Sequence, residues 1–309
     1  MEYIELTQFL SLSSDEVAGI VRDSGTKVCV FPFNGTRRWF LLEHGHEKYA
    51  DPNDAYMGKT TQAYIRLYKM LFDHGVEKVI APIFGKDILG RGVEYMSRIG
   101  PSMVWLANHP EFLSFYREYR IRIHFYGDYR SDLLKVPDGA YLIQQFDDAT
   151  AKTASDSKRG LFYGIFANDA TEEIARISTL RSRVDGTVPT RREIVEAYYG
   201  EYIEKADLFI GFERFSSYDY PMLNLGTESM YFTVAPSLYM TETLLRKILH
   251  DHIFLRSASE PDYATMSPES LNAMRYYYTK KRDEAFGIGV VRDGIWYEGS
   301  EIGDWTWDS

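Results

Sequence analysis

The chain has 309 residues, of which 45% are hydrophobic and 26% charged, so it can bury a large core. Its net charge of −10 argues against binding to nucleic acid, which selects basic surfaces, and its single cysteine, Cys29, excludes an internal disulfide. No apolar run approaches the ~18 residues of a membrane span, and the N-terminus is acidic where a signal peptide is basic. We therefore expect a cytoplasmic protein without stable membrane insertion, with one domain over residues 1–309.

Predicted strands and helices alternate along the chain. Apolar runs predict strands at 27–33, 78–84, 121–125, 142–146, 161–166, 208–212 and 230–234. Helical spacing predicts helices at about 13–21, 56–74, 95–119, 170–177, 191–206 and 241–255. Residues 43–55 look like a loop, and the tail at about 283–309 looks irregular. This alternation is typical of an α/β fold with a mostly parallel central sheet flanked by helices.

The most informative stretch follows the first predicted strand and reads FPFNGTRRW over 31–39. Gly35 allows the backbone to approach an anion closely, and the adjacent Arg37 and Arg38 offer rigid guanidinium donors for phosphate oxygens. At the C-terminal end of a buried strand, these residues predict a phosphate site on the ligand edge of an α/β sheet. The alternative is a strand end with two solvated arginines.

The same stretch resembles the signature of the cis-prenyltransferases, in which an apolar strand ends in Asp-Gly-Asn-x-Arg-Trp. Further similarities follow in the family's order at 75–79, 121–128, 166–169, 207–216 and 230–233. Longer runs, among them 31–40, 125–129, 189–194 and 231–237, resemble the branch that contains tuberculosinyl adenosine transferase, tuberculosinol synthase and kolavelool synthase. The resemblance implies an undecaprenyl diphosphate synthase-like fold, a homodimer, and Mg²⁺-assisted chemistry on a bicyclic diterpenyl diphosphate.

The resemblance also assigns roles to single residues. The diphosphate site that it implies consists of Gly35, Thr36, Arg37, Arg38, Arg214 and Ser216. The implied substrate pocket contains Trp39 and Phe84, and the implied catalytic residues are Asn34, Tyr56 and Arg37. Tyr56 matches the tyrosine that this branch places beside the reacting carbon, where a phenol can stabilise a cation or relay a proton. The alternative is that Tyr56 is one more of the 24 tyrosines, packed at a helix start.

Two departures from the family pattern matter. Asn34 stands where the family has the aspartate that helps to bind Mg²⁺, and an amide keeps an acceptor oxygen but loses the charge that hard cations prefer. Either the protein ionises its substrate with less help from the metal, or Asn34 is an engineered Asp→Asn change. Residues 208–211 lack the arginine with which chain-elongating relatives hold a second diphosphate. That absence argues against elongation with isopentenyl diphosphate.

These observations predict a diterpene synthase. Its arginines stabilise the leaving diphosphate as the allylic C–O bond breaks, Mg²⁺ shares that charge, and water captures the cation to give a diterpene alcohol. Transfer of the diterpenyl group to adenosine is the first alternative. A non-catalytic partner subunit of the same fold is the second, since loss of the aspartate at position 34 suits one.

Other motifs are weaker. Asp147 and Asp148 resemble half of the metal motif of helical terpene synthases, but we expect them in a loop or helix cap. His44 and His46 have no third ligand at metal spacing. Gly58-Lys59-Thr60 lacks the preceding glycine of a nucleotide-binding P-loop.

Overall fold

A parallel β-sheet forms the centre of the protein. The computed structural model describes residues 1–135, 138–153, 156–167, 169–256 and 261–298. Within them, six strands form one sheet in the order β3-β4-β2-β1-β5-β6, and every pair is parallel. The strands are β1 Val28–Val30, β2 Lys78–Phe84, β3 Arg122–Tyr126, β4 Gly160–Ile165, β5 Leu208–Phe212 and β6 Ser229–Thr233. Because all six run in one direction, the segments that follow them meet at a single edge.

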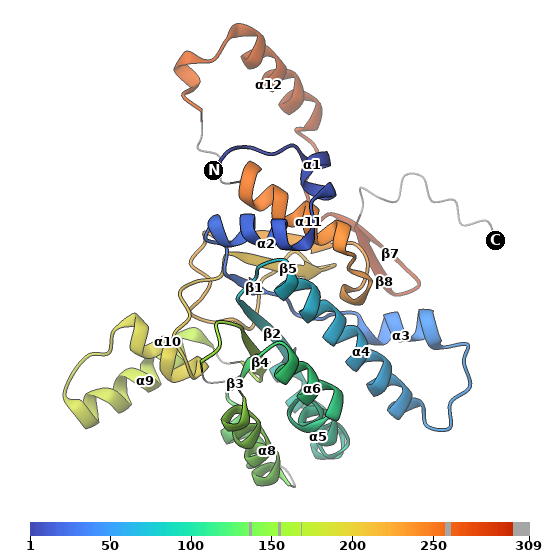
Figure 1. Cartoon of the computed structure of the whole chain (residues 1–309), viewed down its shortest axis with the longest axis vertical. Coiled ribbons are helices and arrows are strands. Elements are labelled where there is room, and N and C mark those ends of the chain that lie inside the picture. Colours follow the sequence, from blue (N-terminus) through green and yellow to red (C-terminus); the bar gives the residue numbers. More distant parts are fainter. Residues whose placement is uncertain (136–137, 154–155, 168, 257–260, 299–309) are drawn as a thin grey trace.

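Helices surround this sheet, and the last of them lies apart from it (Figure 1). They are α1 Leu6–Ser11, α2 Ser14–Asp23, α3 Thr36–His44, α4 Pro52–Asp73, α5 Val93–Asn108, α6 Pro110–Glu118, α7 Tyr129–Leu133, α8 Gly139–Lys152, α9 Ala170–Asp185, α10 Arg191–Tyr199, α11 Glu242–His250 and α12 Pro268–Lys281. A hairpin of β7 Gly289–Arg292 and β8 Ile295–Glu298 follows α12. None of the described helices is long and apolar enough to cross a bilayer.

Alternation along the strands creates a core on each face of the sheet. Cys29 and Val79 belong to the larger core, which includes residues of α2, α4, α5, α6, α8 and α11. Val30 and Ile80 point the other way, into the smaller core under α9 and α10. Strands that are buried on both faces have continuous apolar sequences, which explains why the runs predict them well.

The structure confirms the α/β fold and the parallel sheet, but the strand predicted at 142–146 is wrong. These residues belong to α8, in which Leu142, Phe146 and Ala149 recur at helical spacing and face the larger core. A short apolar run fits a buried helix as well as a strand, so periodicity alone did not separate them. Asp147 and Asp148 therefore lie in a helix and not in the expected loop; Asp147 pairs with Arg130.

Several predicted boundaries also differ. The helix expected over 95–119 is two helices, α5 and α6, because the residue before Pro110 is extended. The helix expected to reach 206 ends at Tyr199, where Gly200 adopts a φ of 85°. The tail expected to be irregular contains the β7–β8 hairpin, and the asparagine predicted to help cap α9, Asn168, lies outside the described residues.

A charged cluster braces the edge of the sheet at which β2 and β3 begin. The Glu201 carboxylate accepts hydrogen bonds from Lys78 Nζ and His124 Nε2, and lies 3.5 Å from the Arg122 guanidinium. Burial on its own raises the pKa of this carboxyl, but the bonds from His124 and Lys78 outweigh it and lower the pKa of Glu201 to about 2. The cluster ties the segment after α10 to two strands, at the edge opposite the predicted phosphate site.

Candidate active site

The turn from β1 into α3 is fixed by close packing at Gly35. This residue has a φ of 72°, in the left-handed region. A Cβ at position 35 would lie 2.9 Å from the Phe212 ring and 2.9 Å from Pro236 Cβ. Both the φ and the space therefore require glycine. The close approach places the first turn of α3, with its free N–H groups, against the end of β5 and the segment that follows β6.

Asn34 is held by two of these neighbouring segments. Its N–H donates to Ser237 Oγ at 3.0 Å, and its carbonyl accepts from the Ser237 N–H at 3.1 Å. Its side-chain amide nitrogen donates to the hydroxyl of Tyr218, in the loop after β5. The predicted metal-binding position is thus fixed through both its backbone and its side chain.

The two arginines of α3 contact different elements. The Arg38 guanidinium lies 3.5 Å from the Glu213 carboxylate and 5.3 Å from the centre of the Phe212 ring. Arg37 donates to the Tyr95 hydroxyl of α5 at 2.9 Å, and Arg91 donates to the same oxygen at 3.3 Å. Cationic groups from α3 and the segment before α5 therefore meet at the edge of the sheet.

Tyr56 lies beside the turn from β1 into α3, the predicted phosphate turn. Its hydroxyl is 2.7 Å from the Thr36 hydroxyl, so residues from α3 and α4 meet although 20 positions separate them. Burial raises the pKa of Tyr56, and the hydrogen bond with Thr36 and the nearby Arg37 charge offset only part of that effect. The phenol is therefore neutral at pH 7.

The remaining predicted residues lie at the same edge of the sheet. Arg214 and Ser216 are exposed and belong to the loop after β5, directly beyond Glu213, which pairs with Arg38. Phe84 ends β2 and Trp39 belongs to α3; both are partly buried and pack against the larger core. Contacts link Thr36 with Tyr56 and Asn34 with Tyr218, whereas Arg214 is placed by its loop alone.

Sequence reasoning missed several residues of this edge. They are Asp87, Tyr95, Glu213, Tyr218, Asp219 and Ser237. Asp219 is of note because burial, and secondarily the charge of Asp87, raise its pKa to about 6. The rule that ligands bind beyond the carboxyl ends of parallel strands would have drawn attention to 213–219, which directly follows a predicted strand.

The side chains at this edge offer few oxygen ligands to Mg²⁺. Among the described residues, no three His, Cys, Asp or Glu side chains gather as metal ligands. Asn34 offers a single amide oxygen at the position where the resemblance implies a metal ligand. Mg²⁺ in proteins is usually bound through one or two carboxylates, with substrate phosphate oxygens and water completing its shell. Asn34 offers one neutral oxygen instead, so it fits an ion that a bound diphosphate would mainly hold, and the described residues form no complete protein cage.

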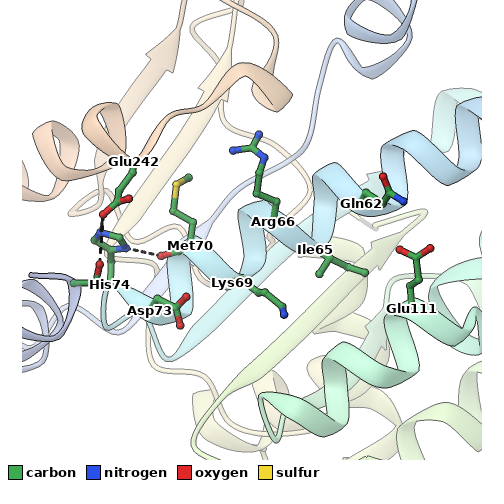
Figure 2. A pocket seen from close by; sticks show the side chains of 10 residues that line it. Gln62, Ile65, Arg66, Lys69, Met70, Asp73, His74, Glu111 and Glu242 are labelled. Carbon is green, nitrogen blue, oxygen red and sulfur yellow. Dashed lines mark hydrogen bonds and ion pairs between the residues drawn. The ribbon is translucent and has the colours of Figure 1, made fainter. Parts of the chain in front are cut away.

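A surface cavity of about 580 Å³ lies elsewhere, along α4 (Figure 2). None of the predicted site residues lines it. Polar groups that line it already have protein partners: Arg66 donates to the carbonyl of Leu238 at 2.7 Å, and the His74 ring lies 3.3 Å from Glu242. These side chains join α4 to the C-terminal part of the chain, which gives the cavity wall a structural role.

Comparison with known proteins identifies the family. No protein-family profile matches the chain. The tuberculosinyl adenosine transferase of Mycobacterium tuberculosis is 49% identical over 298 residues, which cover 96% of this chain and 99% of the relative. The chain belongs to the tuberculosinyl adenosine transferase family. The (+)-kolavelool synthase of Herpetosiphon aurantiacus is more distant, at 24% identity over 90% of this chain and 91% of the relative.

A solved structure confirms the predicted fold. A probable undecaprenyl diphosphate synthase from Campylobacter jejuni matches with a TM-score of 0.53 and 14% identity, over 76% of this chain and 97% of that chain. The chain therefore has the cis-prenyltransferase fold. Together with the family assignment, this makes it an enzyme of prenyl chemistry, a transferase or a terpene synthase.

Proposed function

We propose that the protein transfers a bicyclic diterpenyl group from its diphosphate to adenosine and releases diphosphate. The observation that supports this proposal is the 49% identity, over nearly the whole chain, to a relative named for tuberculosinyl transfer to adenosine. Capture of the cation by water, which we expected first from the sequence, becomes the second candidate. It is favoured by the likeness to (+)-kolavelool synthase, which is only 24% identical.

The diphosphate binds at the first turn of α3 in this proposal. Gly35 and Thr36 offer N–H groups at a helix N-terminus, and Arg37 and Arg38 add guanidinium donors. Arg214 and Ser216 approach from the loop after β5. Arg38 exchanges its partner Glu213 for phosphate oxygens, at little cost because the pair is 3.5 Å apart and partly exposed. These charges stabilise the leaving diphosphate as the C–O bond breaks.

Asn34 is the residue that would offer an oxygen ligand to Mg²⁺ beside the diphosphate. Mg²⁺ supplies charge neutralisation on the leaving group when it is bound. The Asn34 backbone is fixed on both sides by Ser237, so the amide stays at the turn without help from the ligand. Asparagine lacks the negative charge that would hold the ion in the free enzyme. Binding of the ion therefore depends more strongly on the bound substrate.

Tyr56 acts on the carbon side of the reaction. As the C–O bond breaks, a nucleophile forms a new bond to the same carbon, next to an apolar wall that includes Trp39 and Phe84. The neutral Tyr56 hydroxyl orients the nucleophile, and any proton that the nucleophile loses is relayed through the Tyr56 and Thr36 hydroxyls to an oxygen of the departing diphosphate. Partial burial of these groups keeps competing water away from the cation.

The test is product analysis by mass spectrometry. Purified protein is incubated with tuberculosinyl or kolavenyl diphosphate, each with and without adenosine. We expect a diterpenyl adenosine together with one equivalent of released diphosphate; diterpene alcohol alone, in the presence of adenosine, would support the second candidate. Label from isopentenyl diphosphate in a longer chain would defeat both candidates. Diphosphate release without any added protein excludes a non-catalytic partner subunit.

Matched variants identify the site. Removing both guanidinium groups with Arg37→Ala and Arg38→Ala should abolish diphosphate release, because no equal charge remains on α3. Arg181→Ala is the control, since that arginine is exposed on α9 and pairs with Asp185. The homodimer, the single domain and the cytoplasmic location remain predictions; sedimentation equilibrium tests the dimer.

A further inference from the structure

Helix α12 is left uncovered by the part of its own chain that the structure describes. It has 14 residues, and none of them is buried. Its adjacent tyrosines Tyr276, Tyr277 and Tyr278 are 68%, 57% and 62% exposed. Among the described residues, the hydrogen bonds, ion pairs and ring contacts of α12 all join it to itself or to its immediate neighbours in sequence. The helix accordingly stands apart from the sheet and its covering helices (Figure 1).

A helix of this length needs a partner to be stable. Isolated helices shorter than ~12–15 residues are marginal in water, because most helical stability in proteins comes from packing one face against another element. Ser267 caps the N-terminus by accepting a hydrogen bond of 3.1 Å from the Ser270 N–H, but such a cap contributes only about 1 kcal/mol. Exposed aromatic side chains that lie together also mark interaction sites. We therefore expect another molecule to cover α12.

The charge of the helix indicates which molecule this is. Residues 268–282 contain one acid, Glu269, and four bases, Arg275, Lys280, Lys281 and Arg282, which gives a net charge of +3. Because the whole chain has a net charge of −10, the rest of it carries −13. The helix is thus complementary in charge to the body of its own protein. We propose that α12 is a docking arm, which lies on the surface of a second copy of this chain.

A lipid surface fits these features less well. Anionic lipid would attract the basic end of α12 but repel the body of the protein, which carries −13. The three tyrosines occupy successive positions, about 100° apart around the helix axis, so they do not form a single apolar face for insertion. A protein surface can contact a helix on several sides. The inference does not depend on the proposed function, and it goes further than the predicted homodimer because it names the segment that makes the contact.

Photocrosslinking between copies tests the arm directly. Cys29 is the only cysteine of the chain and is fully buried, so Thr279→Cys on the exposed helix introduces the single accessible thiol. Full-length variant protein, mixed from isotopically light and heavy preparations, is labelled with benzophenone maleimide and irradiated. We expect crosslinked peptides that join a light copy to a heavy copy. Ser182→Cys, at an exposed position of α9, is the matched control and should give crosslinks within one copy only.

Two sets of substitutions measure what the arm contributes. Replacing all three tyrosines by serine should weaken self-association at least about tenfold in sedimentation equilibrium, because tyrosines often dominate the binding energy of interfaces. Lys280→Glu combined with Lys281→Glu should weaken it about tenfold at low salt, and less at high salt, where the charges are screened. Arg181→Glu, an exposed reversal on α9, should leave it unchanged. All of these side chains are exposed, so the core stays intact.

Three outcomes would overturn the inference. The first is the absence of light–heavy crosslinks from position 279. The second is unchanged self-association of the serine variant. The third is a monomeric protein that binds anionic phosphatidylglycerol vesicles through the three tyrosines, which would assign α12 to a lipid surface. None of these measurements involves diphosphate or adenosine, so the proposed function and the docking arm stand or fall separately.

Discussion

Replacing Gly35 by alanine tests whether the phosphate turn is built on close packing. Alanine at this position meets two obstacles: a φ of 72°, and a Cβ that would lie 2.9 Å from both the Phe212 ring and Pro236. Gly25 is the matched control, because its φ of 82° is similar but nothing lies within 4 Å of an added Cβ. The difference between the two variants therefore isolates the steric part.

The expected magnitudes follow from these two terms. A left-handed φ costs an alanine roughly 1 kcal/mol, which is the whole effect expected for Gly25→Ala. Overpacking adds about 1–3 kcal/mol, so Gly35→Ala should lower the free energy of unfolding by about 2–4 kcal/mol. The added methyl group should displace the ring of Phe212. The centre of this ring lies 5.3 Å from the Arg38 guanidinium carbon, so Arg38 should shift with it. Diphosphate binding should therefore weaken about tenfold, or ~1.4 kcal/mol.

Urea unfolding and calorimetric titration with diphosphate measure these quantities in the parent and both variants. We expect Gly25→Ala to leave binding unchanged. The reasoning is refuted if Gly35→Ala is as stable as Gly25→Ala and binds diphosphate as the parent does. In that case the turn would have room for a methyl group, and the contact between α3 and the loops after β5 and β6 would not fix the site.

Three further predictions concern single side chains. Tyr56→Phe should lower kcat about a hundredfold while the affinity for inorganic diphosphate stays the same, because the hydroxyl acts only on the nucleophile; equal losses in both would contradict this role. Glu213→Gln should tighten diphosphate binding about two- to fivefold by freeing Arg38, as calorimetry would show, and weaker binding would contradict the partner exchange. Glu201→Gln should cost about 2 kcal/mol of stability at pH 7, after allowance for partial exposure of the carboxylate. Since the folded pKa of about 2 lies below the ordinary value of 4.5, this difference in urea stability should be present above pH 4.5 and shrink as the pH falls toward 2; a pH-independent difference would contradict the assignment.

The local sequence was sufficient to predict the fold class, and it marked the turn at Gly35 as a candidate phosphate site. Buried parallel strands need continuous apolar runs, and a turn that binds anions needs glycine and cations within a few residues, so both leave compact patterns. The run at 142–146 shows the limit of such patterns. An apolar run of this length fits either a strand or a helix. Leu142 and Phe146 lie four positions apart and both face the larger core, which is the spacing of a helix.

The neighbours of the turn could be found only from the tertiary structure. Tyr218 contacts Asn34 across 184 positions, and Ser237 contacts it across 203. These contacts exist because the sheet places β5 beside β1 and β6 beside β5, an order set by the packing of whole helices and strands. A local pattern contains no information on which strands become neighbours. The sequence therefore singled out the residues that we propose as the diphosphate site, and the strand order decided which side chains contact them.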